Sequence, residues 1–379
     1  MAVDGGNDDV LTRLPQDIIF HIFFKLPPKT LLRLRCVSRF LNSLIPHPHF
    51  LSLHIAASAG PRCHHLLNYD SPDSAKSYFS FRADPTLDPS KTFENPFRSV
   101  NGYMRLVGSS RGILCLFDTS YFTSVGTLIF WNPFIRKLKI VPTLPELGCV
   151  WTRISHMAVG FGFDPECDDF KVVKVLYSCD DDPFPSRAFV YELKIGSWRI
   201  INWPPPCFLP MYWTGSVFLR GFVHWLAYER PRFNGPPNCI MGFDMTEEVF
   251  KSMELPKNAV VKGKELRLCP SADEQTLALF VSSRGNMNTV WDLWLMSDYG
   301  NVGSWNRVYT IALDVKFLPL KITNEREILA VRNDKKLVSV NFEKDEVDDL
   351  EVCGLPSSFF ADGYLPSLAL LDCGEQFID

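Results

Sequence analysis

The chain has 379 residues, of which 46% are hydrophobic and 13% aromatic, so it can bury a large core and still carry a small second module. Its formal net charge of −4 and the lack of a basic aromatic groove argue against a nucleic-acid partner. No stretch approaches the roughly 20 apolar residues of a membrane-spanning helix, and the polar, acidic first residues do not resemble a secretion signal, so no membrane contact is expected.

Residues 14–45 predict two short helices with more apolar surface than they can bury themselves. Six of the seven residues from 18 to 24 are apolar, and a helix that is apolar all round needs cover on several sides. Pro27 and Pro28 end this helix, and a leucine-rich series with three- and four-residue steps predicts a second one over 31–44. Because a unit of about 45 residues usually needs outside help to stay folded, we expect it to dock on another surface.

The same segment is basic. Residues 10–55 carry six Lys or Arg side chains against the single acid Asp17, a net charge of +5 in an acidic chain. Complementary potential speeds the encounter of two proteins, so this surface suits an acidic protein partner. A solvated helix face has a similar charge pattern and is the alternative.

Four short motifs in this segment resemble the F-box, the adaptor-binding module of cullin-type ubiquitin ligases. They are residues 14–17 (LPQD), 18–24, 26–31 (LPPKTL) and 35–39 (RCVSR), and 47–50 resembles the F-box end. The resemblance implies that the module binds a Skp-type adaptor and, through it, a cullin. A helical hairpin packed on the rest of the chain is the alternative. The residues expected on the adaptor face, some of which must instead form the module's own core, are Leu14, Pro15, Ile18, Ile22, Leu26, Pro27, Leu31, Leu34, Val37 and Phe40.

Residues 56–76 lose helical periodicity and collect Ser, Pro, Asp and Ala, which predicts a linker. The linker would separate the helical module at 10–55 from a second domain at 77–379. The fold class expected is therefore an α+β multidomain chain, with a small helical module before a large all-β domain.

Beyond residue 77 a unit of several strands recurs at about the 50-residue period of kelch-type blades. Radially stacked blades cover each other's faces and leave only short edges, which a single sheet cannot do. The repeat predicts a kelch-like β-propeller of about six, perhaps seven, blades, with a β-sandwich as the alternative. We expect residues 364–371 to supply a closing strand beside 78–82.

Motifs along this domain resemble the plant F-box proteins that carry an F-box-associated (type 1) domain, including S-locus F-box and F-box/kelch proteins. The matching segments are 108–116, 131–134, 160–165, 169–173, 197–199, 221–226, 243–244, Phe250, 299–300 and 304–305. The resemblance implies a non-catalytic subunit of a Skp–cullin–F-box ubiquitin ligase that recruits a client protein for ubiquitination and proteasomal degradation. A non-degradative, adaptor-bound scaffold is the alternative, and a kelch-type copper oxidase is a more distant one.

Client contacts are expected on loops, because loops on a rigid scaffold carry binding residues and proline lowers the cost of ordering them. Two proline-rich loops and one acidic turn stand out, while the tryptophans that recur at blade positions are predicted to fill the core. The loop residues singled out are Trp203, Trp213, Arg230, Arg232, Phe233 and Asp181.

The sequence motifs that resemble catalytic or metal-binding sites do not predict a catalytic or metal site. Residues 108–112 match the G-x-S-x-G nucleophile elbow, but that elbow needs a following helix, and the residues that follow here are strand-like. The run Cys63-His64-His65 lacks zinc spacing, so neither a metal nor another cofactor is expected. Eleven cysteines without a C-x-x-C pair predict reduced thiols in the cytosol or nucleus.

Overall fold

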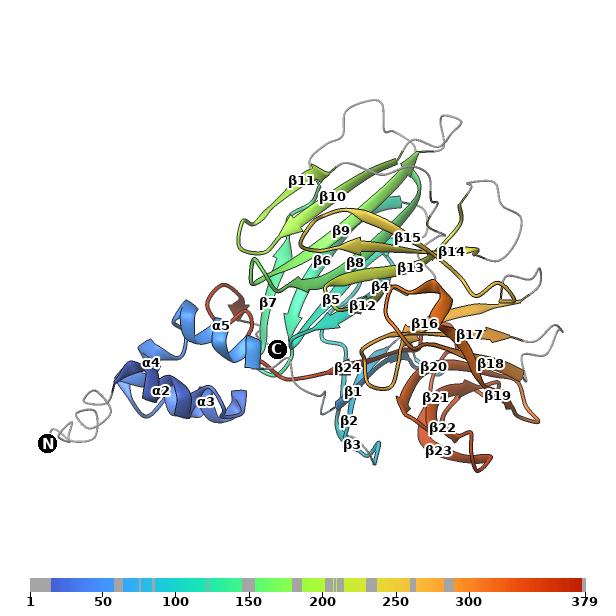
Figure 1. Cartoon of the computed structure of the whole chain (residues 1–379). Helices are drawn as coiled ribbons and strands as arrows, with labels where there is room; N and C mark the ends of the chain where they lie inside the picture. Colours follow the sequence, from blue (N-terminus) through green and yellow to red (C-terminus); the bar gives the residue numbers. More distant parts are fainter. Residues whose placement is uncertain are drawn as a thin grey trace, which may run out of the picture.

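The computed structural model of the chain describes residues 15–57, 64–74, 76–83, 86–120, 123–144, 154–178, 186–201, 207, 209, 215–229, 237–259, 264–282 and 290–376. Short helices at the N-terminal end lie against one side of a large all-β domain (Figure 1). Within these described ranges, no helix has the length and apolar character needed to cross a membrane.

The N-terminal module, which we call the F-box helices, contains α2 (Gln16–Phe23), α3 (Pro28–Arg35), α4 (Arg39–Leu44) and α5 (Pro48–Ala57). Pro28 stands at the first position of α3, where its missing amide is not needed. The single helix predicted over 31–44 is wrong, because the chain breaks at 36–38 and Ser38, in an extended conformation, accepts a hydrogen bond from the Leu41 amide at 3.4 Å. The fourth helix, α5, was not predicted.

The β-domain is a propeller of six antiparallel sheets, which we number as blades in chain order. Blade 1 contains β24 (Phe360–Tyr364), β1 (His64–Asp70), β2 (Ser77–Ala83) and β3 (Pro89–Glu94). Blade 2 contains β4 (Tyr103–Ser110), β5 (Ile113–Ser120), β6 (Thr123–Asn132), β7 (Lys137–Val141) and β25 (Glu375–Gln376). Blade 3 contains β8 (Ile154–Asp164), β9 (Asp169–Ser178), β10 (Ser186–Glu192) and β11 (Ser197–Ile201).

The remaining three blades follow the same pattern. Blade 4 contains β12 (Val217–Leu219), β13 (Phe222–Ala227), β14 (Cys239–Asp244) and β15 (Phe250–Glu254). Blade 5 contains β16 (Leu266–Pro270), β17 (Leu277–Ser282), β18 (Val290–Met296) and β19 (Trp305–Ala312), with the short helix η2 (Val302–Ser304) before β19. Blade 6 contains β20 (Phe317–Asn324), β21 (Glu327–Arg332), β22 (Lys336–Asn341) and β23 (Glu346–Cys353). The predicted propeller is confirmed, with six blades.

A strand from the C-terminal region closes the ring, but not the strand predicted. β24 ends at Tyr364 and pairs with β1, not with β2, in the register His64↔Tyr364 and Asn68↔Phe360. The strand β1 itself lies inside the predicted linker 56–76, with Leu66 and Leu67 fully buried, so that linker prediction is wrong. The polar residues His64, His65 and Asn68 interrupt the apolar pattern that would have predicted this strand.

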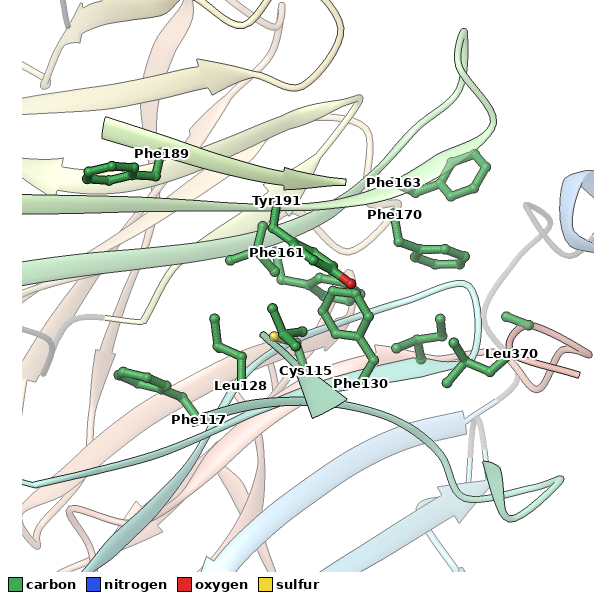
Figure 2. Close-up of a cluster of buried hydrophobic side chains, with 14 of the residues drawn as sticks. Cys115, Phe117, Leu128, Phe130, Phe161, Phe163, Phe170, Phe189, Tyr191 and Leu370 are labelled. Atoms are coloured by element: carbon green, nitrogen blue, oxygen red, sulfur yellow. The ribbon is translucent and has the colours of Figure 1, made fainter. Parts of the chain in front are cut away.

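Aromatic side chains fill the spaces between blades. In Figure 2, Phe130 of β6 faces Phe161 of β8, and their ring centroids lie 5.1 Å apart. Tyr191 of β10 joins them, with its ring centroid 6.0 Å from that of Phe130. The tryptophans predicted as core residues follow this pattern: Trp131, Trp225 and Trp305 are buried, and Trp198 and Trp294 pack half-buried against the same clusters.

Candidate functional site

The helix α2 has one apolar face turned to the F-box core and another turned to solvent. Ile19 and Phe20 are buried, and the ring of Phe20 packs edge-on against Phe50 with centroids 5.6 Å apart. Ile18 and Ile22, four residues apart and therefore on one side of the helix, are 47% and 52% exposed. An exposed isoleucine pair on a helix with a complete inner face is a candidate protein-binding surface.

The exposed apolar surface of the F-box helices extends beyond α2. Val37, between α3 and α4, is 76% exposed, and Pro15 and Pro27 are exposed as well. We call Pro15, Ile18, Ile22, Pro27 and Val37 the open F-box face. All five belong to the residues predicted to contact an adaptor.

The other predicted adaptor residues lie deeper. Leu26, Leu34 and Phe40 are half-buried at the border of the F-box core. Leu31 is fully buried and therefore holds the module together from inside. Leu14 lies outside the described residues.

Basic side chains are exposed on the same helices as the open F-box face and in the turn between α2 and α3. Lys25, Lys29, Arg33 and Arg39 are exposed, and Lys29 Nζ lies 5.4 Å from the centroid of the Phe134 ring in the propeller. The module therefore exposes both apolar residues and positive charge, a combination that favours an acidic protein partner.

The F-box helices are joined to the propeller through a packed interface that the sequence did not reveal. Ile135 from the β6–β7 turn, with Leu368 and Leu371 from the segment after β24, belong to the same buried cluster as the F-box core. In α5, the Ile55 carbonyl accepts a hydrogen bond from Arg111 Nη1 at 3.4 Å, and Ser52 Oγ bonds the Asp168 carboxylate. The two domains therefore share part of one core.

The segment after β24, residues 365–374, fastens this interface. Asn132 Nδ2 donates hydrogen bonds to the carbonyls of Ser367 at 3.0 Å and Ala369 at 2.9 Å. Gly112 has a φ of +83°, and a Cβ at this position would collide with Ser367, so both the turn and the close approach require glycine. Figure 2 shows Leu370 of this segment reaching the cluster between blades 2 and 3.

An ion pair stiffens the turn that contacts α5. Lys171 Nζ lies 2.8 Å from Asp164 Oδ2, and both side chains are almost completely buried. Burial alone would raise the pKa of Asp164, but hydrogen bonds from Lys171 and Thr246 prevail and lower it to about 2. The ionised carboxylate also accepts the amide of Glu166 at 3.0 Å, which shapes the turn that carries Asp168.

A cavity of about 210 Å³ lies at the other end of the inner strands. Its wall includes the first residues of several of these strands: Tyr103 of β4, Val217 of β12, Leu266 of β16 and Phe360 of β24. The F-box helices contact Arg111 and Asp168, which follow the last residues of β4 and β8. The cavity therefore opens on the propeller face that is turned away from the F-box helices.

The predicted client residues Asp181, Trp203, Trp213, Arg230, Arg232 and Phe233 lie outside the described residues. Trp203 and Trp213 lie in the chain between the strands β11 and β12, whose ends are described. Ile201 ends β11 and Val217 begins β12, and Val217 lines the cavity.

The structure gives structural roles to the G-x-S-x-G motif at 108–112 and to His224. Residues 108–112 form the β4–β5 hairpin, where Ser109 Oγ donates to the Asp362 carboxylate at 2.8 Å and a strand follows in place of the helix of a nucleophile elbow. In the described part of the chain, no group of three or more His, Cys, Asp or Glu side chains is placed to hold a metal ion. His224 is a core residue: burial lowers its pKa to about 4, and its ring bonds the Val217 carbonyl at 3.1 Å and Tyr299 Oη at 2.8 Å.

Comparison with known proteins agrees with this architecture. The F-box domain family matches residues 11–53, and the family described as F-box associated beta propeller domain matches residues 80–355. The F-box protein CPR1 of Arabidopsis thaliana is 26% identical over 385 residues, covering 95% of this chain and 89% of that protein. F-box only protein 8 of Arabidopsis thaliana is 26% identical over 255 residues, covering 65% of this chain and 81% of that protein.

The family matches span the F-box helices and five of the six blades completely or in large part, in the order in which they follow along the chain. They agree with the motifs on which the sequence resemblance was based. The chain is a member of the F-box proteins that carry an F-box associated β-propeller domain.

Proposed function

We propose that this protein is the substrate-receptor subunit of a Skp–cullin–F-box ubiquitin ligase, acting in the cytosol or nucleus. The observation that supports this most directly is the open F-box face, an exposed apolar surface on a basic module of the F-box family. A Skp-type adaptor would cover this face and connect the chain to a cullin. The propeller would hold the client protein.

In this proposal the receptor performs no bond chemistry. It holds client lysines near the ubiquitin-charged enzyme, which raises their effective concentration and makes the transfer nearly intramolecular. The shared core between the F-box helices and the propeller supports this role, because a rigid connection restricts the distance between client and ligase. A freely jointed linker would spread the client over a larger volume and lower that concentration.

The proposal is tested by an aspartate on the open F-box face. Ile22→Asp places a charge where the adaptor would bury an apolar anchor, and loss of such an anchor costs about 2 kcal/mol or more, a fall in affinity of roughly thirtyfold. The full-length variant should no longer co-precipitate a plant Skp-type adaptor or a cullin. Val308→Asp is the matched control, because Val308 is 41% exposed on the outer strand β19, far from the F-box helices, and should leave both partners bound.

The same variants separate a ligase receptor from a non-degradative scaffold. A receptor predicts that client proteins accumulate when Ile22→Asp replaces the parent protein in the plant. Intact adaptor and cullin binding by the parent, with no protein accumulating in the variant, would favour the scaffold. Parent-like adaptor binding by Ile22→Asp would contradict the proposed binding face.

A further inference from the structure

We infer that the central cavity of the propeller recognises an acidic residue of the client protein, with Arg267 as the group that pairs with its carboxylate. This inference rests on the proposed function and adds the class of side chain that the receptor reads. It uses the cavity on the face turned away from the F-box helices.

Arg267 is the second residue of the inner strand β16 and lines the cavity. Its side chain is half-buried, yet within the described part of the chain it makes no hydrogen bond or ion pair. Burial lowers the pKa of Arg267, with Glu265 as the one carboxylate whose field opposes this shift. A guanidinium with five donors and no acceptor, partly removed from water, gains most from an incoming carboxylate.

The cavity wall also contains the carboxylates of Asp70 and Asp362, and their hydrogen bonds within the protein bear on whether a positive or a negative ligand is favoured. Asp362 already accepts hydrogen bonds from the amide of Ser109 at 3.2 Å and its hydroxyl at 2.8 Å. The Asp70 side chain is hydrogen-bonded with Ser77, and burial raises its pKa. The wall's carboxylates are thus engaged by the protein, whereas Arg267 keeps its donors available.

The second arginine of the wall has a partial role. The guanidinium of Arg105 lies 5.9 Å from the centroid of the Tyr103 ring, and both residues line the cavity. Arg105 adds positive potential to the cavity wall. The cavity therefore presents Arg267 as its main recognition group.

The size of the cavity fits a side chain and not a cofactor. At about 210 Å³ it lies below the roughly 300–1,000 Å³ of pockets that enclose drug-sized ligands. Phe218, Phe359 and Phe360 contribute apolar surface to its wall. Beside this apolar surface a charge-assisted hydrogen bond is stronger than in bulk water, so one acidic side chain of a client loop or tail would bind there.

The inference is tested by selecting peptides on the full-length protein bound to its Skp-type adaptor. A random peptide library displayed on phage is the probe, and the structure predicts that selected peptides share an Asp or Glu at one fixed position. Arg267→Gln should weaken binding of a selected peptide by about tenfold or more, because a buried charge pair loses one partner. Arg267→Glu should reverse the preference, so that peptides with Lys or Arg at that position bind better.

Arg307→Gln is the matched control, since Arg307 is exposed on the outer strand β19 and its Nη1 lies 3.6 Å from Asp292 Oδ1. It should bind the selected peptides as the parent does. Selection without an acidic position, selection of basic peptides by the parent, or equal binding by Arg267→Gln would each overturn the inference. Adaptor binding, measured on the same preparations, tests the proposed function separately and should not change in any Arg267 variant.

Discussion

The F-box helices and the propeller bury their apolar side chains in different ways. Each blade is covered by its neighbours, so the closed ring completes its own core. The F-box helices keep Ile18, Ile22 and Val37 exposed on one side. On the other side they complete their core with propeller residues such as Leu368. The small module is therefore built to stand between two partners, one within the chain and one, in our proposal, outside it.

This difference has a consequence for how each region tolerates damage. A substitution that removes packing in a blade leaves most of the large propeller core intact. A substitution that removes packing in the small F-box core is expected to disturb the open F-box face directly. The F-box helices and the propeller also share one interface, so a change there affects how the open F-box face is positioned. Two substitutions with matched controls test these statements.

The largest effect is expected for Leu31→Ala in the F-box core. Leu31 is fully buried, and truncation of a buried leucine to alanine costs about 2–5 kcal/mol of folding free energy. Because the core of the F-box helices is small compared with that of the propeller, the loss should unfold them locally and abolish adaptor binding. Urea unfolding and adaptor co-precipitation of the purified protein are the measurements.

Leu329→Ala in blade 6 is the control, since Leu329 is equally buried but far from the F-box helices. It should lower the free energy of unfolding by a similar amount and leave adaptor binding unchanged under native conditions. If the two variants affected adaptor binding equally, the contrast between the two regions would be wrong.

A smaller effect is expected for Asn132→Ala, which acts on the interface between the regions. The variant leaves the carbonyls of Ser367 and Ala369 without their donor, and each unsatisfied buried group costs about 1–3 kcal/mol. The segment 365–374 should loosen and with it the packing of α5. Faster deuterium uptake in that segment and in α5 is the expected observation, with the blade strands unchanged.

Asn341→Ala provides the comparison for this variant. Asn341 Oδ1 accepts hydrogen bonds from the amides of Glu343 and Lys344, both at 3.2 Å, in the β22–β23 turn of blade 6. It therefore shapes a turn as Asn132 does, but it does not hold the segment after β24. Increased uptake at 365–374 in Asn341→Ala would show that the segment is not fastened by Asn132 in particular.

Sequence alone predicted the F-box helices and the propeller, because both have motifs in local order and, in the propeller, a regular repeat. It missed contacts between distant residues. Nothing local indicates that Asn132 bonds residues 367 and 369, although its motif was noted. The strand β1 was missed because His64, His65 and Asn68 interrupt its apolar pattern although the last two are buried.

The two candidate binding sites differ in the same respect: one could be predicted from local motifs and the other could not. The open F-box face could be predicted from its motifs, but only the structure separates exposed Ile18 and Ile22 from buried Leu31. Arg267 has no motif around it, and its significance appears only when the ring brings β4, β12, β16 and β24 around one cavity. The cavity forms only when strands that are far apart in the sequence come together in the ring, and the spacing of residues along the chain does not predict it.

The most direct test of the account is hydrogen–deuterium exchange of the full-length protein with and without a plant Skp-type adaptor. We expect the adaptor to slow exchange in α2 and around residues 36–38, while the strands that line the central cavity exchange as before. Slowed exchange confined to the propeller, or none anywhere at saturating adaptor, would contradict the claim that the open F-box face is the docking surface.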